Sequence, residues 1–183
     1  MSINLITGNE DAKRAVVNQL RMNKSSGTYL FYGKKGAYLK EFALAFAKGI
    51  NCNESVHDFC DKCRVCENIN KEIYSDLHII SASEGTVKID QIRELIKNAS
   101  ETSYEMGKKV FIIEDVNKLR KEASNALLKI IEEPPKDTYF ILLANSLNIL
   151  PTIKSRSLAI EIQKLTHEEL EVEESLYNFF LGR

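Results

Sequence analysis

The feature that most constrains the fold of this chain is a regular alternation of short apolar runs with amphipathic stretches. The apolar runs are nearly continuous, so we expect each to be a strand that is buried on both faces of a sheet. These strands are predicted at residues 27–33, 76–81, 108–116, 138–145 and 157–162. Between them, apolar residues recur at intervals of three and four, which is typical of helices with one buried face. Helices are therefore predicted at residues 10–24, 39–46, 88–101, 120–133 and 166–181.

Strands and helices that alternate in this order build β-α units, which assemble into a parallel sheet with helices on both faces. The predicted fold class is therefore α/β. We expect one α/β domain over residues 1–162 and a further helix within residues 163–183. A length of 183 residues is sufficient for one such domain with a substantial core.

The charge and the N-terminus of the chain exclude some classes of protein. Lys and Arg number 25 and Asp and Glu 26, so the net charge of −1 provides no general attraction to nucleic acid. The N-terminal residues lack the basic start and apolar run of a signal peptide, and no apolar stretch is long enough to span a bilayer. We expect a cytoplasmic protein without a membrane partner.

All four cysteines lie within one short segment, at positions 52, 60, 63 and 66, with the spacing C-x7-C-x2-C-x2-C. In a reducing compartment such clustering favours a metal over disulfides, and the alternative of buried or disulfide-linked cysteines carries less weight. Four thiolates complete a tetrahedral shell around Zn²⁺ and leave no open position. The sequence therefore predicts a structural zinc module at residues 52–66, with Cys52, Cys60, Cys63 and Cys66 as the ligands.

One histidine, His57, lies inside this segment and offers an alternative to one of the thiolates. Because four cysteines already complete the shell, we expect His57 to be an exposed polar residue of the loop. A small zinc module can also bind RNA. Its position directly after the first helix of a β-α unit favours an insertion that supports the fold or a protein contact.

The stretch FYGKKGAYLKEF, residues 31–42, is similar to a phosphate-binding loop in which the residues that contact phosphate and Mg²⁺ have been replaced. Such a loop has the pattern G-x-x-x-x-G-K-[ST]. With Gly33 as the first glycine, the second glycine, the lysine and the hydroxyl positions hold Tyr38, Leu39 and Lys40. Leucine supplies no charge to a phosphate, and a tyrosine ring crowds the space where glycine lets the backbone approach. The loop is therefore predicted to keep its strand–turn–helix shape but not its chemistry.

Two acids, Glu114 and Asp115, follow the apolar part of the strand predicted at residues 108–116. In P-loop NTPases an acid at this place helps to hold Mg²⁺. The alternative is a polar strand end that leads into a turn, and the pair alone does not decide between the two. Similarly, Arg156 is either a surface arginine or an arginine finger that stabilises charge on a neighbour's phosphate.

Residues 125–157, NALLKIIEEPPKDTYFILLANSLNILPTIKSRS, resemble the AAA+ clamp-loader ATPase family, in which a helix ending in LEEPP leads to the sensor-1 strand and then to LLPTI-x-SRC. The cysteine segment has the position it takes in the bacterial subunits, gamma/tau and delta-prime of DNA polymerase III. The segment LITGNEDAKRAV, residues 5–16, also resembles the opening of the family. The resemblance covers roughly residues 1–162 and implies an AAA+ (P-loop NTPase-like) fold.

The resemblance also implies which residues form the site. A degenerate nucleotide site would comprise Gly33, Gly36, Lys40, Glu114 and Asp115 and would bind ATP weakly or not at all. Asn145 and Ser146 are both candidates for the sensor-1 residue. Arg156 would be the arginine finger, acting in trans on an ATP-binding neighbour. Intact gamma/tau subunits keep the glycine, lysine and hydroxyl that this chain has lost.

By the same resemblance, the chain is expected to be a non-hydrolysing, delta-prime-like subunit of the DNA polymerase III holoenzyme. Its partners would be the gamma/tau and delta clamp-loader subunits and, through the complex, the sliding clamp and primed DNA. Family members continue into a helical lid and a collar, so residues 163–183 are expected to begin the lid and the collar to be absent.

Two alternatives stay open at this point. One alternative is an active gamma/tau-like ATPase with an unusual loop, and the other is a zinc-dependent nucleic-acid-binding module. The missing lysine argues against the first alternative, and the near-neutral charge argues against the second.

Overall fold

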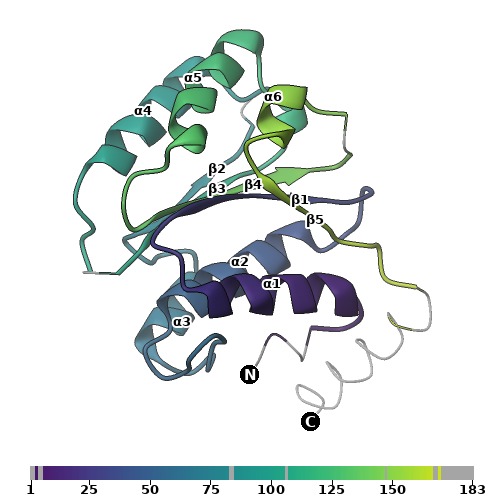
Figure 1. Cartoon of the computed structure of the whole chain (residues 1–183), viewed down its shortest axis with the longest axis vertical. Coiled ribbons are helices and arrows are strands. Elements are labelled where there is room, and N and C mark those ends of the chain that lie inside the picture. Colours follow the sequence, from purple (N-terminus) through teal and green to yellow (C-terminus); the bar gives the residue numbers. More distant parts are fainter. Residues whose placement is uncertain are drawn as a thin grey trace.

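Five parallel strands form a single sheet, and the parallel arrangement is the one that the sequence predicts (Figure 1). Their order in the sheet is β2-β3-β4-β1-β5. The computed structural model describes residues 3, 6–82, 85–105, 107–146, 148–166 and 169. The strands are β1 (Gly27–Tyr32), β2 (Leu77–Ile80), β3 (Lys109–Ile113), β4 (Thr138–Ala144) and β5 (Leu158–Glu161). Each falls within a predicted apolar run.

Helices cover both faces of the sheet, which confirms the predicted α/β class (Figure 1). The layer on one face contains α1 (Glu10–Met22), α2 (Leu39–Asn51) and α3 (Arg64–Asn70), and the layer on the other contains α4 (Ile89–Ser100), α5 (Lys121–Glu132) and α6 (Pro151–Lys154). The sequence did not predict α3, α6 or the 3-10 helix η2 (Val116–Lys118), each too short to show a hydrophobic repeat. The predicted helix 166–181 lies outside the described residues, apart from Thr166 and Glu169. Every helix in the described part is too short or too polar to cross a membrane.

The sheet divides the core into two clusters, because neighbouring residues of a strand point to opposite faces. Tyr29 of β1 packs edge-on against Phe46 of α2, with ring centroids 4.7 Å apart. Leu30 belongs to the opposite cluster, where Phe111 and Phe140 stack at 5.4 Å. Both central strands β3 and β4 are buried at every residue, which explains why their sequences are apolar without alternation.

Buried polar groups fasten the amino ends of the strands to the connecting loops. The carboxylate of Asp76, which is fully buried, accepts hydrogen bonds from the backbone N–H groups of Tyr104 and Glu105, both at 2.9 Å. Lys109 at the start of β3 donates to the carbonyls of Asn98 and Glu101, where α4 ends. A cation at this place satisfies terminal carbonyls and opposes the negative end of the helix dipole.

The chain after β5 runs directly over the loop that follows β1. The backbone N–H of Ile162 donates to the carbonyl of Tyr32 at 2.7 Å, and the N–H of Gly33 donates to the carbonyl of Ala144 at 3.1 Å. A Cβ atom on Gly33 would lie only 2.1 Å from the carbonyl oxygen of Ile162. Glycine at this position is therefore required by backbone packing.

We expect Gly33→Ala to lower the unfolding free energy by about 2 kcal/mol, because overpacking against a fixed backbone atom costs roughly 1–3 kcal/mol. For a chain of this length, that corresponds to a fall of about 4–8 °C in the thermal midpoint, measured by circular dichroism. Lys35→Ala, in the exposed part of the same loop, is the matched control and should leave the midpoint unchanged. Equal midpoints for the two variants would contradict this role of Gly33.

Candidate functional site

The carboxyl ends of β1, β3 and β4 meet at one edge of the sheet, where ligands of open α/β sheets usually bind. A pocket of about 210 Å³ lies at this edge. It is lined by Ala37, Leu39, Lys40, Glu41, Glu114, Asp115, Leu143 and Asn145. The fold thus brings together the loop after β1, the two acids after β3 and the polar residue after β4.

The loop between β1 and α2 is short and tightly turned. A hydrogen bond from the N–H of Ala37 to the carbonyl of Lys34, at 2.9 Å, closes a turn in which Gly36 has φ +91°. Few residues other than glycine adopt such a conformation without strain. Leu39, at the position that a phosphate loop gives to lysine, begins α2 and is a buried member of the core.

Lys40 points from the first turn of α2 toward carboxylates. Its Nζ lies 2.7 Å from Oε1 of Glu72 and 3.4 Å from Oε1 of Glu114. The hydrogen bond to Glu72, together with the negative charge of Glu114, raises the pKa of Lys40 above its ordinary value. Glu72 was not predicted, because it follows α3 and is brought to Lys40 only by the fold.

Both acids after β3 are fully engaged by side chains of this chain. Oε2 of Glu114 accepts a hydrogen bond from the Ser81 hydroxyl at 2.5 Å. Asp115 accepts one from the Asn145 amide on Oδ1, at 2.7 Å, and forms an ion pair with Lys118 through Oδ2, at 2.8 Å. Each of the four carboxylate oxygens therefore contacts a donor, two of them a lysine ammonium.

The two sensor-1 candidates have different places in the structure. Asn145 lines the pocket, and its side chain binds Asp115. Ser146 is instead hydrogen-bonded by the amide of Asn117, at 3.3 Å to its hydroxyl and 3.4 Å to its carbonyl. Asn117 also accepts the backbone N–H of Asn145 at 3.1 Å, so it fixes the turn after β4.

Arg156 is not one of the residues that line this pocket, and it lies just after α6. Its Nε donates to Oε2 of Glu132 at 2.9 Å, and its Nη1 donates to the carbonyl of Thr152 at 3.2 Å. The hydrogen bond from Arg156 lowers the pKa of the Glu132 carboxyl. The EEPP and SRS motifs, far apart in the sequence, are thus joined by one ion pair.

The sulfur atoms of Cys52, Cys60, Cys63 and Cys66 all lie within 4.8 Å of one another, so this donor set fits one metal ion. Four thiolates bound to Zn²⁺ at about 2.3 Å lie roughly 3.8 Å apart in a tetrahedron. Backbone N–H groups donate to two of these sulfurs, from Cys63 to Cys60 at 3.3 Å and from Cys66 to Cys63 at 3.5 Å. Hydrogen bonds from the backbone of Lys62 and Cys63 lower the pKa of Cys60 to about 7, whereas burial raises that of Cys66.

The cysteine module is attached to α2 by a shielded ion pair. Lys48 Nζ lies 2.6 Å from Oδ1 of Asp61, and the two side chains are only 8% and 16% exposed. The same ammonium lies 4.1 Å from the centre of the Phe59 ring, and Asn70 donates to Asp61 at 2.9 Å. Burial opposes ionisation of Asp61, but the hydrogen bonds from Lys48 and Asn70 leave its pKa below the ordinary value.

His57 differs from the prediction of an exposed loop residue. It is half-buried, has a left-handed backbone with φ +63°, and its Nδ1 donates to the carbonyl of Leu20 at 3.1 Å. It therefore anchors the module to the end of α1. The close group of metal-ligand atoms found in the described part of the chain contains the four cysteines and not His57.

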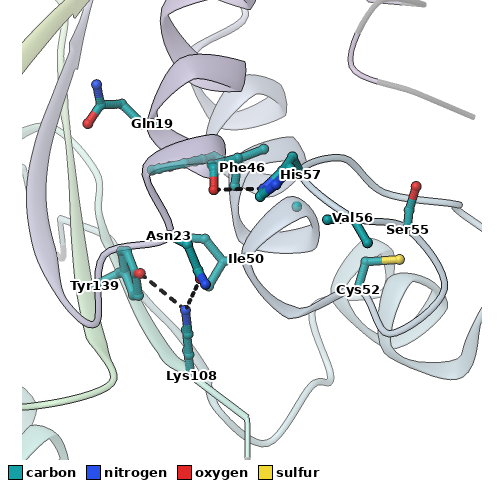
Figure 2. A pocket seen from close by; sticks show the side chains of 12 residues that line it. Gln19, Asn23, Phe46, Ile50, Cys52, Ser55, Val56, His57, Lys108 and Tyr139 are labelled. Carbon is teal, nitrogen blue, oxygen red and sulfur yellow. Dashed lines mark hydrogen bonds between the residues drawn. The ribbon is translucent and has the colours of Figure 1, made fainter.

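A second pocket, of about 220 Å³, lies at the opposite end of the strands, between α1, α2 and the cysteine loop (Figure 2). Lys108 reaches toward it and donates to Oδ1 of Asn23 at 3.3 Å and to the Tyr139 hydroxyl at 3.5 Å. Of the predicted site residues, Cys52 alone lines this pocket. The predicted nucleotide site and the cysteine module are thus separate features of the domain.

The parallel sheet, the loop–helix unit after β1 and the acids after β3 define an AAA+-like α/β domain with an inserted four-cysteine module. A point variant of RuvB from Thermotoga maritima shares this fold with a TM-score of 0.68 and 15% identity, over 99% of this chain and 54% of that chain. The family described as "DNA polymerase III, delta subunit" matches residues 8–166, and the chain therefore belongs to this family.

Two curated relatives come from Bacillus subtilis (strain 168). The DNA polymerase III subunit delta' is 34% identical over 159 residues, which are 86% of this chain and 48% of the relative. The DNA polymerase III subunit tau is 35% identical over 170 residues, which are 90% of this chain and 30% of the relative. The chain thus spans about half or less of the length of these relatives, and identity alone does not separate the two kinds of subunit.

Replacement of a cysteine in the module should remove a bound metal ion. We expect one ion per chain in the purified protein, measured by atomic emission, and none in Cys66→Ser. A ligand at about 100 times its dissociation constant stabilises a fold by roughly 2.7 kcal/mol, so a loss of at least this size is expected in denaturant unfolding. Ser55→Ala, in the same loop but outside the cluster, should keep both metal and stability. A full metal content in Cys66→Ser would contradict the four-cysteine shell.

Proposed function

We propose that this chain is a non-hydrolysing, delta-prime-like subunit of the DNA polymerase III clamp loader. The observation that carries the proposal is the state of the pocket at the carboxyl edge of the sheet. The position that needs a phosphate-binding lysine holds the buried Leu39, and the acids nearby are engaged by Lys40 and Lys118. Gamma/tau-like activity would require an ATP site that these residues do not supply.

Magnesium and ATP do not fit the residues of this pocket. A phosphate loop supplies a lysine for the β- and γ-phosphates and a hydroxyl for Mg²⁺. Here, the hydroxyl position is Lys40, whose ammonium would repel a divalent cation. Gly33 and Gly36 keep the turn that the fold needs, so we propose that ATP is not bound or is bound only weakly.

The chemical contribution of the chain is then proposed to be Arg156, offered to the ATP of a neighbouring gamma/tau subunit. An arginine finger supplies a positive charge to the phosphates in the transition state. Supporting this, the Arg156 side chain keeps 31% of its surface exposed while Glu132 and Thr152 hold Nε and Nη1. Its wider partners would be the delta subunit, the sliding clamp and primed DNA.

The four-cysteine module is proposed to hold a structural zinc ion. A shell of four thiolates has no open position for a substrate, and thiolates select zinc over harder metals. In this arrangement, the module supports α3 and the loop after it and takes no part in chemistry.

A clamp loader reconstituted with gamma/tau, delta and this protein tests the role of Arg156. We expect Arg156→Ala to abolish hydrolysis at the one neighbouring site and so to lower the DNA-stimulated ATPase rate by that site's share, because arginine fingers contribute roughly 10³–10⁵ in rate at a single site while other sites remain active. Lys154→Ala, an exposed cation two residues away, is the matched control and should retain the rate. An unchanged rate in Arg156→Ala would remove the arginine-finger role.

The proposed loss of nucleotide binding is tested by calorimetric titration of the chain with ATP and Mg²⁺. We expect no saturable binding in the micromolar range, because the phosphate lysine and the Mg²⁺ hydroxyl are missing. Micromolar saturation with hydrolysis would instead support an active gamma/tau-like ATPase. Tight, strongly salt-dependent binding of DNA or RNA by the isolated chain would support a nucleic-acid-binding module.

A further inference from the structure

Lys40 lies in the pocket at the carboxyl ends of the strands, beside an acid that in a phosphate-loop protein would help to hold Mg²⁺. We propose that the ammonium of Lys40 takes the place of the divalent cation in a network with Glu72, Glu114 and Ser81. Asp115 is held separately by Asn145 and Lys118, so that neither acid needs a metal. The inference deepens the proposed function. It rests on that proposal in one respect, namely that this pocket does not hydrolyse ATP. It assigns Lys40 a stabilising role, whereas the phosphate-loop pattern shows only that a hydroxyl is missing at this position.

The geometry around Lys40 is that of a bridging cation. Its ammonium contacts one carboxylate from the end of β3, Glu114, and one from the loop after α3, Glu72, at 3.4 and 2.7 Å. A divalent ion in such a place would bridge carboxylates in the same way. The lysine provides one positive charge and three donors with no demand for octahedral geometry.

Each of the remaining oxygens already contacts a donor of this chain. Ser81 occupies the second oxygen of Glu114, and Asn145 and Lys118 occupy the two oxygens of Asp115. A cation such as Mg²⁺ binds oxygen lone pairs at about 2.0–2.1 Å and would have to displace these donors. It would also stand beside two ammonium groups, which repel it at short range.

The backbone supports a built arrangement at both acids that flank the network. Glu72 and Asp115 are non-glycine residues with φ +57° and +53°, in the left-handed region. This region is uncommon for a glutamate and is held only where the surroundings compensate for the strain. The Glu114 side chain is 24% exposed and that of Lys40 38%, so solvent screens the ion pair only in part.

The experiment measures binding of Mn²⁺ alone, without nucleotide, by electron paramagnetic resonance of the zinc-loaded protein. We expect the parent chain to show no saturable site. Lys40→Ser, which restores a hydroxyl, should show one saturable Mn²⁺ site at concentrations about tenfold below the highest at which the parent stays unsaturated, because one repelling charge is removed. Lys35→Ser changes the same charge in the exposed part of the loop and should behave like the parent. Adding Glu114→Gln to Lys40→Ser should abolish the gained binding.

Thermal unfolding provides a second measurement on the same variants. The zinc-loaded protein is placed in buffer without any other metal ion. There, Lys40→Met is expected to unfold at a lower temperature than Lys35→Met, because Glu72 and Glu114 lose their shared cation. Saturable Mn²⁺ binding by the parent chain, no gain in a folded Lys40→Ser, or equal midpoints for the two methionine variants would each overturn the inference. Micromolar binding of ATP with hydrolysis by the parent would refute the non-hydrolysing role, whereas these nucleotide-free measurements judge Lys40 separately.

Discussion

The double burial of the central strands is the constraint on which the rest of this structure depends. Because β3 and β4 are covered at every residue, their side chains must be apolar on both faces, and polar groups are confined to the strand ends. The parallel arrangement then collects the carboxyl ends at one edge. The acids Glu114 and Asp115 become neighbours of Asn145 for this reason, although Asn145 lies far from them in the sequence.

Much of the fold and part of the site could be predicted from the sequence. Local patterns in the sequence predict the strands, the helices and the cysteine cluster. Wherever the structure describes the predicted residues, it contains the strand, the helix or the group of sulfur atoms that the pattern indicates. The ion pairs of Lys40 with Glu72 and of Arg156 with Glu132 could not be predicted, because charged residues at such separations carry no periodic signal. His57 was predicted to be exposed because the sequence does not show that its loop folds back onto the end of α1.

The loop after β1 shows how a fold and a chemical task make separate demands on the same residues. Gly33 is held by the close passage of the Ile162 carbonyl, a requirement that does not depend on nucleotide. Leu39 contributes to the core, and Lys40 is tied to carboxylates on two other segments. Gly33, which serves backbone packing, matches the pattern of a phosphate loop, whereas the positions that would touch a phosphate or a metal do not.

The placement of Cys63 has a consequence for how the module folds. Its sulfur accepts the N–H of Cys66 and caps α3, a helix of only seven residues. A helix of this length is unstable alone in water, because nucleating the first turn costs more than so few hydrogen bonds return. A metal ion bound by the four sulfurs would fix Cys63 and Cys66 together and so provide the nucleus. Binding of a metal and formation of α3 would then be one cooperative event, which would also set in place the loop that carries Glu72 to Lys40.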